Sequence, residues 1–240
     1  MISVITITQY KRRYALQLLY KCILDQIQRP DEWVITEGSQ SKEDADQNEI
    51  LINDFIKLSE IPIVYVPYQG ETKLGGLRNR GNNSCSGDII VCMDDDDFYP
   101  NTRIQHVVDR FSEYPNVNLA GCTNILIYDY GLKQFYQCKG YNPYHSTNNA
   151  MAWRKSYTST HQHDESKRFG EESSFTNQFS EPMVQLLPIH TVIVSSHSEN
   201  TFDKKEVLKN KTWFTLLQYE LLVQLMTHDT IESYSKLFYI

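Results

Sequence analysis

Four consecutive aspartates, Asp94–Asp97, follow a short apolar run and constrain this chain more than any other feature. The run Ile89–Met93 is apolar throughout, which is typical of a strand buried on both faces of a central sheet. Carboxylates at the carboxyl end of such a strand lie in the crevice where open α/β sheets bind ligands. Because adjacent carboxylates repel one another, we expect a divalent cation, Mg²⁺ or Mn²⁺, among them. A solvated acidic turn is the alternative.

The composition excludes several classes of protein. The 240 residues, 40% of them apolar and 22% charged, suffice for one large or two small globular domains. The net charge of −7 argues against a dedicated nucleic-acid binder, which would carry a basic stripe. Apolar stretches are far shorter than the roughly 20 residues of a transmembrane segment. The five cysteines form no C-x-x-C pair, which indicates reduced thiols in a cytoplasmic protein rather than a disulfide framework or zinc site.

Strand and helix patterns alternate along the first hundred residues. Strands are predicted at 2–8, 32–37 and 61–67, and helices at 14–26 and 41–60. A loop with the sequence GGLRNRG at 75–81 is then predicted to open a helix, so that its arginines and the helix N-terminus could bind phosphate. A simple turn with surface arginines is the alternative. The alternation predicts an α/β fold with a mostly parallel sheet and right-handed crossovers.

The second half is less regular. A hairpin is predicted over 119–130 and 133–138, followed by tyrosines that could stack on a sugar ring or pack across strands. Glu171 and Glu172 precede a predicted helix at 173–179, where they would act in chemistry or cap the helix. His197 follows a late strand and is either a metal ligand or structural.

The C-terminal region is predicted to be helical. The pattern predicts one long helix over 204–226 that is apolar on more than one face. Such a helix forms a homodimer contact, docks on a membrane-bound partner, or packs on its own domain. We expect packing on the same domain, with a homodimer as the alternative.

Taken in order, these landmarks resemble the GT-A fold glycosyltransferases, most closely the inverting family 2 type. The resemblance covers about residues 2–201. It rests on five features: the strand at 4–6, Glu37-Gly38-Ser39 in place of Asp-Asp-Gly-Ser, the sequence LRNRG at 77–81, Asp94–Asp97, and the acidic pair Glu171-Glu172. It implies one Rossmann-like GT-A domain at 1–203, with a nucleotide-binding half at 1–100 and an acceptor-binding half at 101–203. Residues 204–240 would form a C-terminal helical extension.

The resemblance also implies where the metal and the nucleotide bind. A D-x-D motif formed by Asp94 and Asp96 would hold the metal and the donor diphosphate. Asp96 would ligate the metal, and Asp94 would lie at the metal or contact the ribose or an ordered water, although a run of four acids permits other registers. His197 matches a further metal ligand of the family. The residues implied to bind the nucleotide-sugar are Thr6, Thr8, Tyr10, Glu37, Lys73, Arg78, Asp94 and Asp95. Glu37 stands where the family has Asp, which leaves the base preference open.

The implied reaction is a metal-dependent transfer of a sugar, with inversion, from a nucleotide-diphosphate donor. A UDP-sugar is the expected donor, and the acceptor is a hydroxyl of a glycan, a protein or a small molecule. Glu172 would remove the acceptor proton, with Glu171 beside it, while the cation and Arg78 or Lys73 neutralise the leaving diphosphate. A nucleotidyltransferase, a sugar-nucleotide hydrolase and a non-catalytic binding module are the alternatives.

Overall fold

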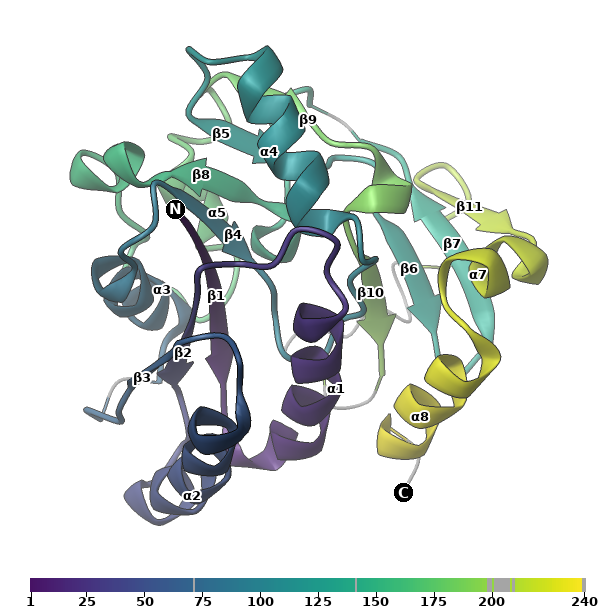
Figure 1. The fold of residues 1–240 in the computed structure, drawn as a ribbon. Coiled ribbons are helices and arrows are strands. Elements are labelled where there is room, and N and C mark those ends of the chain that lie inside the picture. Colours follow the sequence, from purple (N-terminus) through teal and green to yellow (C-terminus); the bar gives the residue numbers. More distant parts are fainter. Residues whose placement is uncertain (71, 141, 198–199, 201–207, 209, 239–240) are drawn as a thin grey trace.

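The computed structural model describes residues 1–70, 72–140, 142–197, 200, 208 and 210–238, which form two β-sheets with helices packed around them (Figure 1). The strand order is β3-β2-β1-β4-β8-β5-β9 in the larger sheet and β10-β6-β7-β11 in the smaller. The larger sheet contains β1 (Ile2–Thr8), β2 (Glu32–Glu37), β3 (Ile63–Val66), β4 (Ile89–Cys92), β5 (Leu119–Gly121), β8 (Ala152–Arg154) and β9 (Met183–Gln185). The smaller contains β6 (Leu126–Asp129), β7 (Gln134–Cys138), β10 (Ile193–Ser196) and β11 (Phe214–Leu217).

Strand β1 is an interior strand of the larger sheet because both of its edges are paired. It runs parallel to β2 on one side and to β4 on the other, and all seven of its residues are buried. Successive side chains point to opposite faces, so that Val4 joins a cluster with Leu16, whereas Ile5 joins a second cluster with Cys85. Strand β8 runs antiparallel to β4, which makes the sheet mixed. The predicted α/β fold with a mostly parallel sheet is confirmed.

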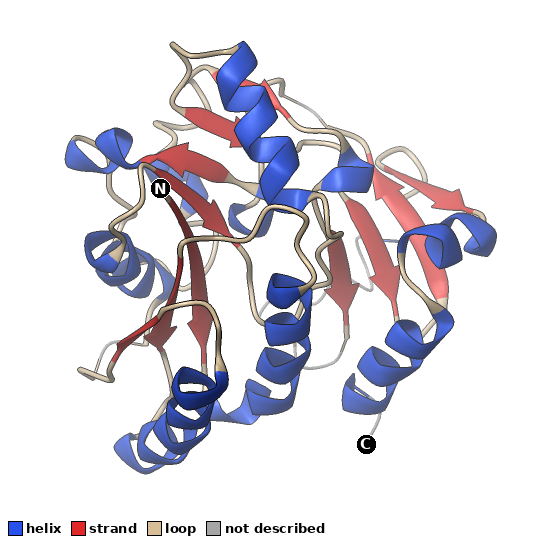
Figure 2. Ribbon diagram, in the orientation of Figure 1, coloured by secondary structure: helices blue, strands red, loops and turns tan. Residues whose placement is uncertain are grey.

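Helices cover the sheets and connect the parallel strands (Figure 2). They are α1 (Arg13–Leu24), α2 (Lys42–Leu58), α3 (Leu74–Ser84), α4 (Arg103–Glu113), α5 (Glu172–Phe175), α7 (Tyr219–Leu225) and α8 (His228–Phe238). The rings of Tyr20, Trp33 and Phe55 stack on one another and join α1 and α2 to β2. All five cysteines are free. None of the helices in the described residues is long and apolar enough to span a membrane.

Gly75 and Gly76 lie within the first turn of α3, not in the loop that the sequence predicts before the helix. A Cβ atom on Gly75 would lie 1.9 Å from the carbonyl oxygen of Asp164. The Gly75 N–H also donates to the carbonyl oxygen of Lys167 over 3.2 Å. Glycine is therefore needed at this position because the segment at 164–167 packs directly against the helix.

The predicted hairpin is divided between the two sheets. Strands β6 and β7 form an antiparallel hairpin in the smaller sheet, whereas β5 pairs with β8 and β9 in the larger one. The hairpin turn is held by Asp129, whose Oδ1 accepts a hydrogen bond from the N–H of Leu132 over 2.7 Å. Strand β10 pairs in parallel with β6.

The single long helix predicted over 204–226 is not continuous in the described residues, since 219–225 are helical but 214–217 are a strand. Residues 204–207 and 209 lie outside the described residues, and 214–217 form β11, an antiparallel partner of β7. The aromatic and β-branched residues of this segment favour a strand once a sheet edge is available to them. Helices α7 and α8 follow, and α8 packs against α1 of the same chain.

Tyr234 of α8 anchors the C-terminal segment to the core. Its side chain is fully buried, and its hydroxyl donates to the carbonyl oxygen of Asp97 over 2.9 Å. We expect Tyr234→Ala to lower the free energy of unfolding by about 4 kcal/mol, and Tyr234→Phe by about 1 kcal/mol, in urea titrations. Tyr219, which is 40% exposed, is the matched control, and its replacement by alanine should cost less than about 1 kcal/mol. Equal losses at the two positions would contradict this anchoring role.

Candidate active site

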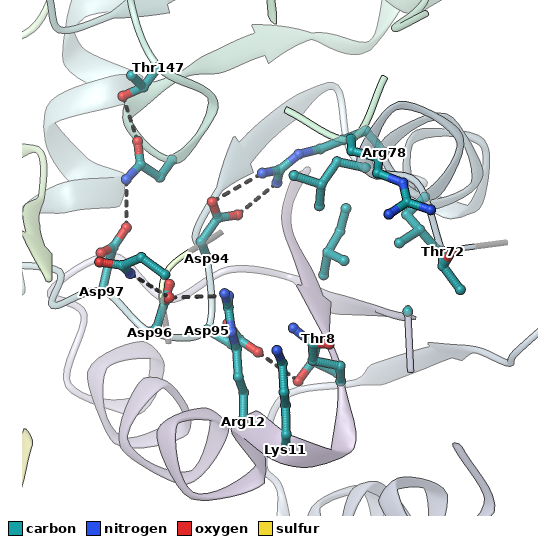
Figure 3. A pocket seen from close by; sticks show the side chains of 18 of the residues that line it. Thr8, Lys11, Arg12, Thr72, Arg78, Asp94, Asp95, Asp96, Asp97 and Thr147 are labelled. Carbon is teal, nitrogen blue, oxygen red and sulfur yellow. Dashed lines mark hydrogen bonds and ion pairs between the residues drawn. The ribbon is translucent and has the colours of Figure 1, made fainter. Parts of the chain in front are cut away.

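A cleft of about 440 Å³ opens where β1 and β4 end, and the acidic loop Asp94–Asp97 lines it (Figure 3). Both strands point their carboxyl ends toward this edge because they run parallel. The larger sheet thus brings the acidic loop next to Thr8. Arg78 of α3 reaches the same cleft from the neighbouring helix.

Asp94 is held by Arg78. Nη1 and Nη2 of Arg78 donate to Oδ1 and Oδ2 of Asp94 over 2.7 and 3.0 Å (Figure 3). Nε of the same guanidinium lies 3.3 Å from Oε1 of Glu171. Burial alone would lower the pKa of Arg78, but the charges of Asp94 and Glu171 and the hydrogen bonds to Asp94 act together to raise it. Arg78, which the sequence predicts to contact the donor, therefore also connects the acidic loop to the Glu171–Glu172 pair.

Asp95 and Asp97 fix the shape of the loop. Asp95 is completely buried, and its Oδ2 accepts a hydrogen bond from Oγ1 of Thr8 over 2.9 Å. Burial raises the pKa of Asp95 to about 7, the neighbouring Asp96 adds to this, and the charge of Arg12 opposes it. Asp97 accepts from the N–H of Ser195 on β10 over 2.8 Å, which ties the acidic loop to the smaller sheet.

Asp96 faces His197, which the resemblance also implies to be a metal ligand. Nε2 of His197 lies 3.3 Å from Oδ2 of Asp96, and Nδ2 of Asn200 lies 3.4 Å from the same oxygen. Both Asp96 and His197 are at most 6% exposed. The ring of Phe238 on α8 stacks on His197 with 3.7 Å between ring centroids. The fold thus brings together two residues that are 101 positions apart, as the resemblance implies.

The oxygen and nitrogen ligands of this pair suit a divalent cation whose remaining coordination positions are filled by substrate. Among the residues that the structure describes, no three His, Cys, Asp or Glu side chains gather closely enough to form a whole metal site. A carboxylate and an imidazole that face each other nevertheless fit a cation that keeps its remaining positions for water and phosphate oxygens. Asp96 and His197 are therefore the residues that would hold it.

The two glutamates of the acidic pair differ in their surroundings. Glu171 is buried and accepts from Nδ2 of Asn148 over 2.9 Å, in addition to its ion pair with Arg78. Glu172 begins α5 and is less buried. Burial raises the pKa of Glu172 to about 7, and the charge of Glu171 adds to this. A pKa near 7 suits a general base, whereas the carboxylate of Glu171 is bound by Arg78 and Asn148.

The residues predicted to contact the nucleotide occupy different positions. Thr8 lines the cleft. Thr6 is fully buried, donates to the carbonyl oxygen of Met93 over 2.7 Å and accepts from Trp33. Glu37 is also fully buried. Its carboxylate accepts from the groups Ser39 N–H, Asn48 Nδ2 and Tyr65 Oη.

Two further predicted residues stand beside the cleft rather than among its lining residues. Tyr10 follows β1, and the guanidinium of Arg13 lies 4.4 Å from the centre of its ring. Lys73 is the residue that precedes the first turn of α3, between Thr72 and Leu74, which do line the cleft. His197, Glu171 and Glu172 likewise adjoin the acidic loop and Arg78 without lining the cleft. The assignments of Thr6, Tyr10, Glu37 and Lys73 to nucleotide binding stay predictions.

Sequence reasoning missed three cations that line the cleft, namely Lys11, Arg12 and Arg168. Arg12 is the closest to the acids, with Nη1 3.1 Å from Oδ1 of Asp95 and 3.1 Å from Oδ2 of Asp96 (Figure 3). A signal was present, since the basic run at 11–13 begins three residues after the end of β1, whose carboxyl end lies at the same edge as that of β4. No comparable pattern marks Arg168.

Comparison with known proteins agrees with this fold. Residues 3–170 match the family model "Glycosyl transferase family 2". A comparison with curated protein sequences gave no match. Among solved structures, the mannosyltransferase PcManGT from Pyrobaculum calidifontis, in complex with GDP-Man and Mn²⁺, has a TM-score of 0.64 at 12% identity. TarS 1–349 from S. aureus has a TM-score of 0.59 at 13% identity, and its UDP complex one of 0.57.

These structures are longer than this chain. The alignment covers 83% of this chain and 58% of PcManGT, and 81% of this chain and 60% of TarS 1–349. At such identities the likeness shows the GT-A fold alone. The family match, in contrast, extends over more than half of the chain. The chain therefore belongs to glycosyl transferase family 2.

Proposed function

We propose that this glycosyltransferase moves a sugar, with inversion, from a nucleotide-diphosphate donor to an acceptor hydroxyl, and that it requires Mn²⁺ or Mg²⁺. One observation carries the proposal, which is the acidic loop that opens on the cleft with Asp96 against His197. The similar structures were solved with UDP, UDP-GlcNAc, or GDP-Man and Mn²⁺, which supports a nucleotide-sugar donor. We take a UDP-sugar as the first donor to test.

The residues around the cleft divide the chemistry between them. A cation held by Asp96 and His197 would neutralise charge on the leaving diphosphate. Glu172 takes the proton of the acceptor hydroxyl as its oxygen attacks the anomeric carbon, which forms the new bond on the face opposite the departing diphosphate. Arg78 keeps Asp94 and Glu171 in place, so that the acidic loop and the base stay in register.

The predicted division of the chain follows from this assignment. We assign donor binding to residues 1–100 and acceptor binding to 101–203, because Glu171 and Glu172 lie in the second half and the acidic loop in the first. Strand β11 (214–217) pairs with β7 in the smaller sheet, and α8 packs on α1. A cytoplasmic location, which five free thiols favour, and a homodimer both stay predictions.

A donor screen tests the proposal. The protein is incubated with UDP- and GDP-sugars and Mn²⁺, and the released nucleotides are separated by chromatography. The proposal expects free UDP or GDP from at least one donor, and none after chelation of the metal. Release of a nucleoside monophosphate with sugar 1-phosphate would instead show cleavage between the phosphates, as by a nucleotidyltransferase or a sugar-nucleotide hydrolase. Absence of any turnover with a broad acceptor panel would favour a binding module.

The raised pKa of Glu172 predicts how the rate depends on pH. A general base acts only when it is deprotonated, so kcat/KM should rise with pH. The rise should be centred at or below about pH 7, because burial sets the Glu172 pKa to about 7 and a cation bound nearby lowers it. Initial rates between pH 5 and 9 at saturating Mn²⁺ check this expectation. A rate that falls over this range would contradict a carboxylate base.

A further inference from the structure

Arg12 contacts the same carboxylate oxygen that the proposed function gives to the metal. Its Nη1 lies 3.1 Å from Oδ2 of Asp96, and His197 approaches that oxygen to 3.3 Å. The Arg12 side chain is 17% exposed and lines the cleft. Burial alone would lower its pKa, but the charges of Asp96 and Asp95 raise it, so the guanidinium stays charged.

A guanidinium and a divalent cation cannot both bind this oxygen closely. Their charges repel, and the buried walls of the site screen that repulsion poorly. Arg12 has a long, flexible side chain, and Lys11 beside it also lines the cleft. When the guanidinium of Arg12 leaves Asp96, it therefore remains within a cleft sized for a ligand. A diphosphate is the anion that best matches the planar, bidentate geometry of a guanidinium.

We propose that Arg12 is a switch residue, an inference that rests on the proposed function. Arg12 competes with the divalent cation for Asp96. Once the cation displaces it, Arg12 binds the diphosphate of the donor. Without the cation, Arg12 neutralises the acidic loop. With the cation bound, the same charge stabilises the donor. Metal binding then prepares the cleft for the nucleotide, which gives an ordered sequence of metal before donor.

The neighbouring Arg13 provides a matched control. Its guanidinium lies 4.4 Å from the ring centres of both Tyr10 and Tyr14, and Nη1 donates to the carbonyl oxygen of Tyr10. It is not among the residues that line the cleft. Removing the charge of Arg13 changes the net charge of the protein as much as removing the charge of Arg12 does. It leaves the contacts of Asp96 unchanged.

The first experiment measures Mn²⁺ alone, by electron paramagnetic resonance of the free ion. Arg12→Gln should bind Mn²⁺ about tenfold more tightly than the wild type, because its competitor is gone. Arg12→Lys keeps the charge and should stay near the wild type, as should Arg13→Gln. Circular dichroism melting confirms that each variant is folded. An unchanged affinity in Arg12→Gln, or an equal gain in Arg12→Lys, would overturn the competition.

The second experiment measures UDP and GDP at saturating Mn²⁺, by calorimetry. Arg12→Gln should bind the better of the two at least tenfold more weakly, since a charge-assisted contact to phosphate is lost. Tighter Mn²⁺ binding with unchanged nucleotide binding would overturn the switch to the diphosphate. Because neither experiment needs sugar transfer, both remain decisive if the proposed reaction fails. A wild type that binds no Mn²⁺ would refute both this proposal and the metal dependence.

Discussion

Glu172→Gln is expected to lose on the order of 10²- to 10⁴-fold in turnover while it still binds donor and metal, which is the usual range for a positioned general base. Glutamine keeps the shape of the side chain and removes only its ability to take a proton. The fold should survive this change. Burial raises the pKa of Glu172 to about 7, so ionisation of Glu172 destabilises the folded state as the pH rises from the pKa of this group in the unfolded chain toward 7. Glutamine does not ionise and avoids this cost. Steady-state kcat, with donor affinity measured separately, checks the expectation.

Glu171→Gln is the comparison that separates the two acids. It should cost less turnover than Glu172→Gln, but it weakens a buried ion pair with Arg78 and should therefore lower the free energy of unfolding. Urea titration alongside kinetics distinguishes the two effects. The opposite ranking of turnover would move the base to Glu171. Near-wild-type rates in both variants would remove the pair from the mechanism.

Asp96→Asn is expected to weaken Mn²⁺ binding by more than about 100-fold and to abolish metal-dependent binding of UDP or GDP. An amide carries no negative charge to attract the cation. Even the loss of a residue that only hydrogen-bonds to a metal ligand lowers metal affinity by about 10- to 100-fold. Calorimetry with Mn²⁺, and then with nucleotide at saturating Mn²⁺, makes the measurement directly.

Asp88→Asn is the control for this change. Asp88 lies just before β4, at the opposite end from the acidic loop, and pairs at the surface with the N-terminal amine over 2.8 Å. Its loss should leave both affinities unchanged. If Asp96→Asn bound Mn²⁺ as well as Asp88→Asn does, the assignment of Asp96 as a metal ligand would be wrong.

Local sequence pattern was enough to place the acidic loop and the sheet around it. An apolar run such as Ile89–Met93 has one stable location, inside a sheet covered on both faces, and the acids must then lie at its carboxyl end. The pairing of His197 with Asp96 came from the family resemblance rather than from the pattern. Helices at 14–26 and 41–60 are predicted for the same local reason, since their apolar residues recur with the helical period, and the structure has them at 13–24 and 42–58.

Contacts between distant segments could not be predicted in this way. Gly75 looks like part of a phosphate loop until the packing of Asp164 against it is known. Arg78 is predicted to contact the nucleotide-sugar, but most of its N–H groups bind Asp94 and Glu171. The segment at 214–217 carries a helical pattern, yet the free edge of β7 takes it as a strand. In each case tertiary packing overrides the local signal.

The central claim is that this cleft transfers a sugar from a nucleotide-diphosphate with inversion. The most direct test is a proton NMR time course of the wild-type protein with Mn²⁺, an acceptor, and the donor that the screen identifies. We expect the donor signal to be replaced by the nucleoside diphosphate and by a product whose new glycosidic bond has the opposite anomeric configuration. A product that retains the configuration of the donor, or the appearance of sugar 1-phosphate, would contradict it.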